Sequence, residues 1–239
     1  MRIMCKWLGP DRARTASMPG SPTATRVQRR STGSDRGYLG LFGNETVVPG
    51  GLRAEAVRIF ISAPYHAQVH LATGTEVGLV VKERRVQGAA VFDFGTPPKY
   101  QRTDDVILTY PCEGVAGTAT KLLAEVPSPY SPRDLVSHPI GQSPYFFADE
   151  RNHVSPTGQK TLIEVINLLV TELVLGATVA MLAVMTREND ANAPFLGVGF
   201  AYAAPDQPRK AATRYRVRAT IRSENDNKTT LVDYTFTTG

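Results

Sequence analysis

The chain holds few residue combinations that could carry out a reaction. Its four histidines, His66, His70, His138 and His153, are scattered along the sequence. The first two are four residues apart, a spacing that suits a metal ion on a helix, but they lie in an apparent strand and turn. On a strand, this spacing separates the two rings by about 13 Å. We therefore predict no metal site and no cofactor.

The acidic residues offer no clear catalytic pair. Asp104 and Asp105 are adjacent, and neighbouring residues of a strand point to opposite faces. Two polar loops, 187–192 and 223–228, both contain Glu-Asn-Asp and could bind calcium if they met in the fold. Solvated hairpin turns explain them more simply, since Asn and Asp tolerate the left-handed backbone of such turns. The sequence thus predicts a protein that is not an enzyme.

Positive charge gathers at the N-terminus. Residues 1–37 carry eight Lys or Arg against two Asp, a net charge of +6, whereas the whole chain has a net charge of +5. Arginine binds phosphate through a bidentate fork, and each neutralised phosphate releases counterions. We predict that this segment binds nucleic acid without reading its sequence. The arginines concerned are Arg12, Arg14, Arg26, Arg29, Arg30 and Arg36.

A second set of arginines alternates with apolar residues near the C-terminus. Tyr215, Val217, Ala219 and Ile221 occupy every second position, which on a strand places them on one face. The opposite face carries Arg214, Arg216, Arg218 and Arg222. These arginines could extend a basic surface, or they could form salt bridges on an exposed sheet face or at a subunit contact.

Most of the chain after residue 54 reads as short strands separated by turn signals. Val, Ile, Thr, Tyr and Phe dominate these segments, and little helix is predicted between them. This pattern is typical of an antiparallel sandwich or barrel. The predicted strands span 55–62, 67–73, 76–83, 86–94, 104–110, 115–126, 177–186, 195–203, 213–222 and 229–237.

Two segments differ from this pattern. Six prolines interrupt residues 127–160, which we interpret as a functional or interface loop. Residues 161–185 are strongly apolar, but Glu164 and Glu172 would be costly in a membrane. Apolar residues at helical spacing there predict a helix over about 160–173, followed by a buried strand at 177–186. We therefore predict no membrane span.

These observations combine into a two-part organisation. Residues 1–50 contain few large apolar side chains and many Gly, Pro, Ser and Thr, so they predict a flexible basic arm. Residues 51–239 predict a mainly β domain. Its expected fold is an antiparallel β-sandwich of about eight strands with one or two short helices.

An Arg-rich arm before a Pro- and Gly-punctuated β domain resembles the coat proteins of small icosahedral RNA viruses. The resemblance covers the whole chain as a pattern. It implies that the β domain is a jelly roll that builds the shell and that the arm from Arg12 to Arg36 faces the packaged RNA. It further implies that the 127–160 loop contacts other capsid subunits, whether copies or companion chains. The protein would then reside in virions assembled in the host cytoplasm.

Two alternatives stay open at this point. The first is a β-rich subunit of a larger complex in a mitochondrion or plastid, with a transit peptide cleaved near Arg29-Arg30-Ser31, because the N-terminus is rich in Arg, Ser and Thr. The second is an enzyme on a β-barrel scaffold, which would require convergent His and carboxylate ligands.

Overall fold

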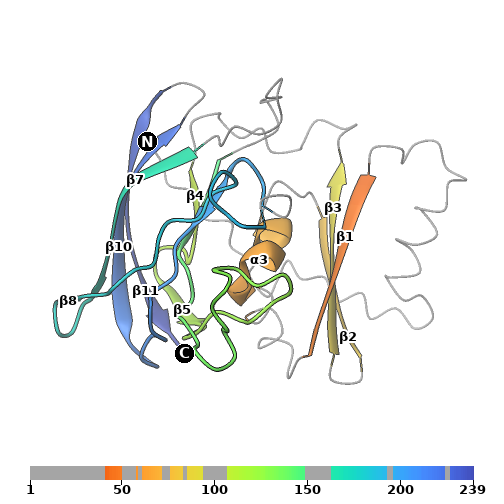
Figure 1. The fold of residues 1–239 in the computed structure, drawn as a ribbon, viewed down its shortest axis with the longest axis horizontal. Helices are drawn as coiled ribbons and strands as arrows, with labels where there is room; N and C mark the ends of the chain where they lie inside the picture. Colours follow the sequence, from red (N-terminus) through yellow and green to blue (C-terminus); the bar gives the residue numbers. More distant parts are fainter. Residues whose placement is uncertain are drawn as a thin grey trace, which may run out of the picture.

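The fold was analysed in a computed structural model (Figure 1). The structure describes residues 41–49, 58, 61–71, 76–82, 85–93, 107–148, 163–192, 196–223 and 227–239. The described part is mainly β and contains one short helix, α3 (Pro64–Leu71). This confirms the predicted mainly β class.

The largest sheet has five strands in the order β5-β11-β10-β7-β8. Strands β10 and β11 form an antiparallel hairpin, and β10 also pairs with β7. The predicted strands 213–222 and 229–237 are therefore confirmed. The bounds of the five strands are β5 (Val115–Thr118), β7 (Ile163–Glu172), β8 (Ala177–Thr178), β10 (Arg214–Ser223) and β11 (Thr229–Thr238).

A smaller antiparallel sheet faces the large one. Its order is β4-β6-β9, with strands β4 (Leu108–Tyr110), β6 (Tyr145–Phe147) and β9 (Phe200–Tyr202). Isolated bridges join Met181 to Pro205 and Met185 to Tyr202, so the chain after β8 runs along the outer side of β9. Figure 1 shows the two sheets as separate layers, and we call this two-layer unit the sandwich.

The core of the sandwich lies between its two sheets. Phe146 and Ala201 of the small sheet pack with the inner face of the large sheet, which includes Val217, Tyr234 and Phe236. These five side chains are at most 2% exposed. The arrangement follows from the period-two pattern of β10 and β11, because one face of each strand is apolar and must be covered.

The small sheet is buried on its second face too. Tyr145, Phe147 and Phe200 pack there with Tyr65 of α3 and with Leu196. Every residue of β6 and β9 is buried. Helix α3 begins with Pro64, whose fixed backbone angle suits the first helical position. The helix thus covers the sandwich on the side opposite the large sheet.

A separate antiparallel sheet of order β1-β3-β2 forms from the N-terminal part of the chain. Its strands are β1 (Leu41–Pro49), β2 (Glu76–Lys82) and β3 (Arg85–Asp93), which confirms the predicted strands at 76–83 and 86–94. Strand β1 lies within the range 1–50 that the sequence predicts to be a flexible arm, and it pairs with β3 along its whole length. Residues 1–40 lie outside the described residues.

Four local predictions are wrong. Of the buried strand expected at 177–186, only Ala177–Thr178 form a strand, β8, and both residues are exposed. The expected helix over 160–173 is strand β7, and the expected strand at 67–73 begins within helix α3. Residues 58, 61 and 62, within the expected strand 55–62, are helical. Strand β7 contains a bulge opposite Thr220 and Ile221, where one extra residue interrupts the pairing. This irregularity spaces the apolar residues of β7 by two and three, which imitates a helical pattern.

The sandwich also departs from a purely antiparallel arrangement. Strand β11 pairs with β5 in parallel, with Phe236 opposite Val115 and Thr238 opposite Thr118. Residues between 119 and 142 are mostly irregular, so the predicted strand 115–126 is confirmed only at its start. No helix in the described part of the chain is long and apolar enough to cross a membrane.

The two faces of the large sheet predict contrasting effects of alanine substitution. Ile221 is fully buried on β10, whereas Leu231 on the neighbouring strand is 74% exposed. Ile221→Ala should lower the free energy of unfolding by about 2–5 kcal/mol, since it removes core contacts and leaves a cavity. Leu231→Ala should change it by less than about 0.5 kcal/mol. Equilibrium urea unfolding measures both, and equal losses would contradict the assignment of faces.

Candidate functional site

The six arginines predicted to bind nucleic acid in the arm all lie outside the described residues. Arg12, Arg14, Arg26, Arg29, Arg30 and Arg36 therefore remain a prediction from the sequence. The structure likewise describes no side chain at four other residues considered above, which are His70, His153, Asp104 and Asp105.

The second arginine set lies on the outer face of the large sheet, as predicted. Arg214, Arg216 and Arg218 are exposed and Arg222 is partly buried, while the four intervening apolar residues are buried. The alternation along β10 thus places the guanidinium groups on the side away from the core. We call this surface the outer face.

Acidic partners occupy much of the outer face. Arg216 binds Asp233 of β11 through two hydrogen bonds of 2.7 and 2.6 Å. Arg222 is paired with Glu164 of β7, and Arg214 donates to the hydroxyl of Thr235. The hydrogen bond from Arg216 is the main reason that the pKa of Asp233 lies below its ordinary value.

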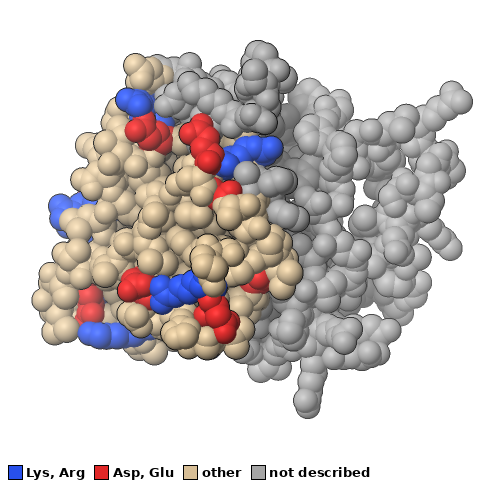
Figure 2. All heavy atoms as spheres, in the orientation of Figure 1, with Lys and Arg blue, Asp and Glu red and all other residues tan. Residues whose placement is uncertain are grey.

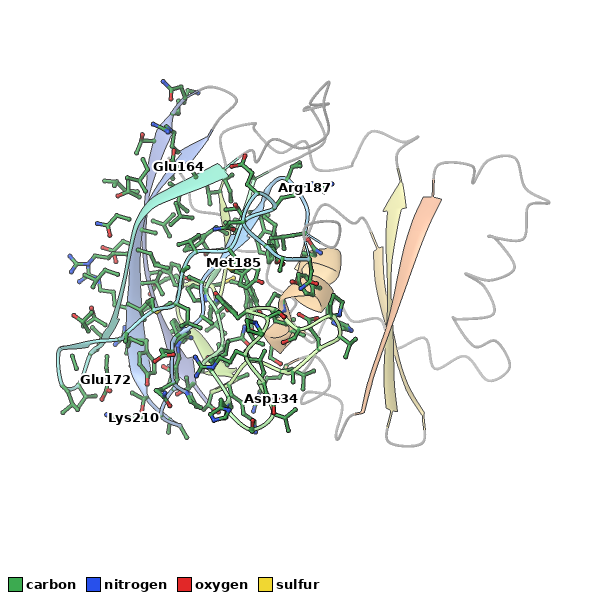
Figure 3. All side chains as sticks on the ribbon, viewed as in Figure 1. Asp134, Glu164, Glu172, Met185, Arg187 and Lys210 are labelled. Carbon is green, nitrogen blue, oxygen red and sulfur yellow. The ribbon has the colours of Figure 1, made fainter. Side chains whose placement is uncertain are left out.

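This pairing favours one of the two interpretations of the outer face. A guanidinium already bound to a carboxylate has less positive field to offer a phosphate. Figure 2 views the large sheet from its edge, and on this side of the described part basic and acidic side chains also lie next to one another. Figure 3 shows Glu164, the partner of Arg222, toward one end of the large sheet, and the buried Glu172 beside Lys210 toward the other. The outer face therefore matches the salt-bridged alternative better than a continuous basic surface.

One histidine has a buried acidic partner. His66 lies on α3, and its Nδ1 is 2.6 Å from Glu125 Oε2. The other carboxylate oxygen of Glu125 accepts a hydrogen bond from the backbone N–H of Tyr65 at 3.0 Å. The Glu125 side chain is only 2% exposed. Glu125 therefore fixes the orientation of the His66 ring and ties α3 to the segment after β5.

The predicted loop 187–192 does not project into solvent as a simple turn. Asp190 is 5% exposed, and both its carboxylate oxygens lie 2.8 Å from the hydroxyl of Tyr65. Asn192 donates its backbone N–H to the same carboxylate and its side-chain amide to Tyr65. Protein donors therefore occupy this carboxylate. Residues 224–226 of the second predicted loop lie outside the described part.

Metal ligation finds no support in the described residues. Among them, no three or more His, Cys, Asp or Glu side chains are grouped so that they could hold a metal ion. The correction of 67–73 from strand to helix does place positions 66 and 70 on one side of α3 by spacing. The wide separation of the His66 and His70 rings that we expected for a strand is therefore wrong. Of these two histidines, only His66 has a described side chain.

Sequence reasoning missed the two most unusual buried charges. Glu125 stands in an unremarkable Leu-Leu-Ala-Glu-Val segment, and Arg209 follows Pro208 in the loop between β9 and β10. Arg209 is 5% exposed, and its guanidinium lies 4.6 Å from the ring centre of Phe236. No spacing or composition signal distinguishes either residue from surface charges, because their burial depends on distant strands.

Comparison with known proteins places the chain in no family. No protein-family model matches it, and no curated protein matches it either.

The buried Glu125 predicts a pH dependence of stability. Burial is the largest cause that raises its pKa above the ordinary 4.5, and the hydrogen bond with His66 opposes this. A carboxyl with a raised pKa binds more protons in the folded than in the unfolded state, so its contribution to stability falls as the pH rises above 4.5. Relative to Glu125→Gln, the wild-type protein should therefore lose stability from pH 4.5 toward neutrality.

Urea unfolding at a series of pH values measures this difference. Asp233→Asn is the matched control, because the lowered pKa of Asp233 predicts the opposite sign. Its contribution should be present above the ordinary pKa of 3.8 and should be lost as the pH falls. A pH-independent difference between wild type and Glu125→Gln would contradict the prediction for Glu125.

Proposed function

We propose that the protein is a structural capsid protein that self-assembles into a closed icosahedral shell and contacts packaged RNA through its Arg-rich arm. The observation that carries the proposal is the division of charge. The first 37 residues have a net charge of +6, which leaves −1 for the other 202 residues. A basic segment beside a nearly neutral β domain suits a division of labour between phosphate binding and assembly.

The pairing on the outer face supports this division. Arg216 and Arg222 are bound to Asp233 and Glu164, so the large sheet keeps few arginines for phosphate. Salt-bridged sheet faces also suit contacts between subunits, where paired charges set the register of association. In this proposal RNA binding belongs to the arm, and the outer face belongs to the shell.

Exposed apolar side chains are consistent with subunit contacts as well. Leu173, Val174 and Leu175 form the turn after β7, and Val174 and Leu175 are 78% and 67% exposed. Val126 and Val136, in the Pro-rich part of the chain, are 97% and 80% exposed. Groups of exposed apolar residues often mark surfaces that other chains cover. The partners would be copies of this chain or companion capsid chains.

The jelly-roll topology belongs to the proposal too. The described strands include a β10–β11 hairpin within one sheet and a parallel β11–β5 pair. The two layers come from the packing of this sheet against β4-β6-β9, and the jelly-roll order of the strands is part of the proposal. Assembly requires the two layers and their exposed surfaces, so it does not depend on this finer assignment.

Particle formation is the first test of the proposal. The purified full-length protein should sediment as large particles, appear as closed shells in electron micrographs, and contain RNA that absorbs at 260 nm. A monodisperse monomer over a range of salt and pH would rule out self-assembly. If N-terminal sequencing of native protein gave a start near Ser31 or Gly33, the imported organellar subunit would be favoured instead.

Removal of the arm is the second test. Deletion of residues 1–36 should leave the sandwich folded, because the deleted segment contains few large apolar side chains. It should reduce RNA packaging and decrease the salt dependence of RNA binding. Loss of six arginine–phosphate contacts would lower the slope of log K against log salt by about 4 for single strands.

A matched control uses the outer face. Replacement of Arg218 by Ala removes an exposed positive charge from β10 and leaves the Arg216–Asp233 and Arg222–Glu164 pairs in place. This variant should package RNA as wild type does. Normal packaging by the arm deletion, or defective packaging by correctly folded particles of the β10 variant, would contradict the assignment of RNA binding to the arm.

A further inference from the structure

Arg209 is a buried cation without a hydrogen-bond acceptor. It lies in the loop that leads from β9 in the small sheet to β10 in the large sheet, and it is 5% exposed. Its Nε, Nη1 and Nη2 atoms are buried, and none has a hydrogen-bond partner. A guanidinium presents five N–H donors, and buried donors in proteins are nearly always satisfied. Among the described residues, the fold therefore supplies no acceptor for this side chain.

Two aromatic rings lie against the guanidinium without supplying that acceptor. Arg209 lies over the rings of Phe236 and Tyr215, at 4.6 and 5.4 Å from their centres. The hydroxyl of Tyr215 accepts a hydrogen bond from the backbone N–H of Lys210. Burial lowers the pKa of Arg209 to about 10, so the group keeps its positive charge at neutral pH. The rings attract the cation through their faces but leave its N–H groups unbound.

A second arginine approaches the same end of the sandwich. Arg58 is exposed, and a Cβ atom added at Gly117 would lie 3.3 Å from Arg58 Nη2. A Cβ atom at the last residue, Gly239, would lie 3.1 Å from Arg58 Nη1. Arg58 thus borders the edge where β5 pairs with β11.

The two arginines act on one tyrosine. Burial is the main cause that raises the pKa of Tyr110 to about 12, and both Arg58 and Arg209 oppose that increase. Both arginines lie beside β5 and the residues that follow it, since the backbone N–H of Arg209 donates to the carbonyl of Thr120 at 2.8 Å and Arg58 lies against Gly117.

We propose that Arg209 and Arg58 bind a small oxyanion of the phosphate class at this end of the sandwich. Planar guanidinium groups match the oxygens of such an anion, and two of them balance a charge near −2. Arg58 is exposed and provides the entrance, while Arg209 provides the buried donors. A polynucleotide backbone is too bulky to reach a side chain that is 5% exposed, so the ligand is a free anion. The inference does not depend on the proposed capsid function.

Inorganic phosphate is the probe that tests this site. In buffers of constant ionic strength, phosphate in place of chloride should raise the thermal midpoint of the full-length protein with a saturable dose response. Direct titration followed by ³¹P NMR should give one site per chain. Arg58→Met should weaken phosphate binding about 10- to 100-fold, the effect of losing hydrogen bonds to a charged group.

Two further variants complete the test. Arg209→Met, which keeps the length of the side chain without its charge, should lose the phosphate response altogether. Arg218→Met removes an exposed arginine from β10 and should respond as wild type does. If Arg209→Met does not fold, Arg58→Met alone decides the matter, because its exposed side chain is not part of the core.

Several results would overturn the inference. No phosphate response in the wild-type protein would show that Arg209 needs no anion. Equal responses in Arg58→Met and wild type would place the binding elsewhere. Displacement of bound phosphate by an oligoribonucleotide, measured with the arm-deleted chain as well as the full chain, would mean that a nucleic acid occupies the site rather than a free anion.

Discussion

The structure depends above all on the burial of the inner face of β10 and β11 against β6 and β9. Val217, Ile221 and Tyr234 are at most 2% exposed, and they contact Phe146 and Ala201 from the opposite sheet. Burying large apolar side chains stabilises a fold by roughly 1.5–3 kcal/mol each, whereas the surface ion pairs on the other side of β10 contribute about 1 kcal/mol or less. The inner face therefore determines the fold, and the outer face is available for other tasks.

This constraint places polar groups in positions that the strands themselves do not favour. The connections between the two sheets must cross the ends of the sandwich, and the loop from β9 to β10 brings Arg209 over the rings of Phe236 and Tyr215. The second face of the small sheet must also be covered, and α3 and the 187–192 loop do this with Tyr65 and Asp190 joined by a hydrogen bond. The buried hydrogen bond between Tyr65 and Asp190 thus arises because the small sheet is apolar on both faces and its second face must be covered.

The parts of the fold that could be predicted are those in which local pattern and tertiary burial agree. Strands β10 and β11 alternate regularly, and both face water on one side, so their period of two was visible in the sequence. Strand β7 has no such clean alternation, because Ile166 lies at a bulge and is 51% exposed. Its apolar residues therefore fit helical spacing although the β10 partner imposes a strand.

The candidate sites divide in the same way. The exposed arginines of β10 could be predicted because exposure follows from alternation, but their pairing with Asp233 and Glu164 could not, since these acids come from other strands. Arg209 and Glu125 are the opposite case, because their burial could not be predicted from the sequence. A charged residue in a loop is expected in water, where Lys and Arg almost always remain unless they are paired. The burial of Arg209 without an acceptor among the described residues could therefore be recognised only in the structure, and it is the observation behind the proposed anion site.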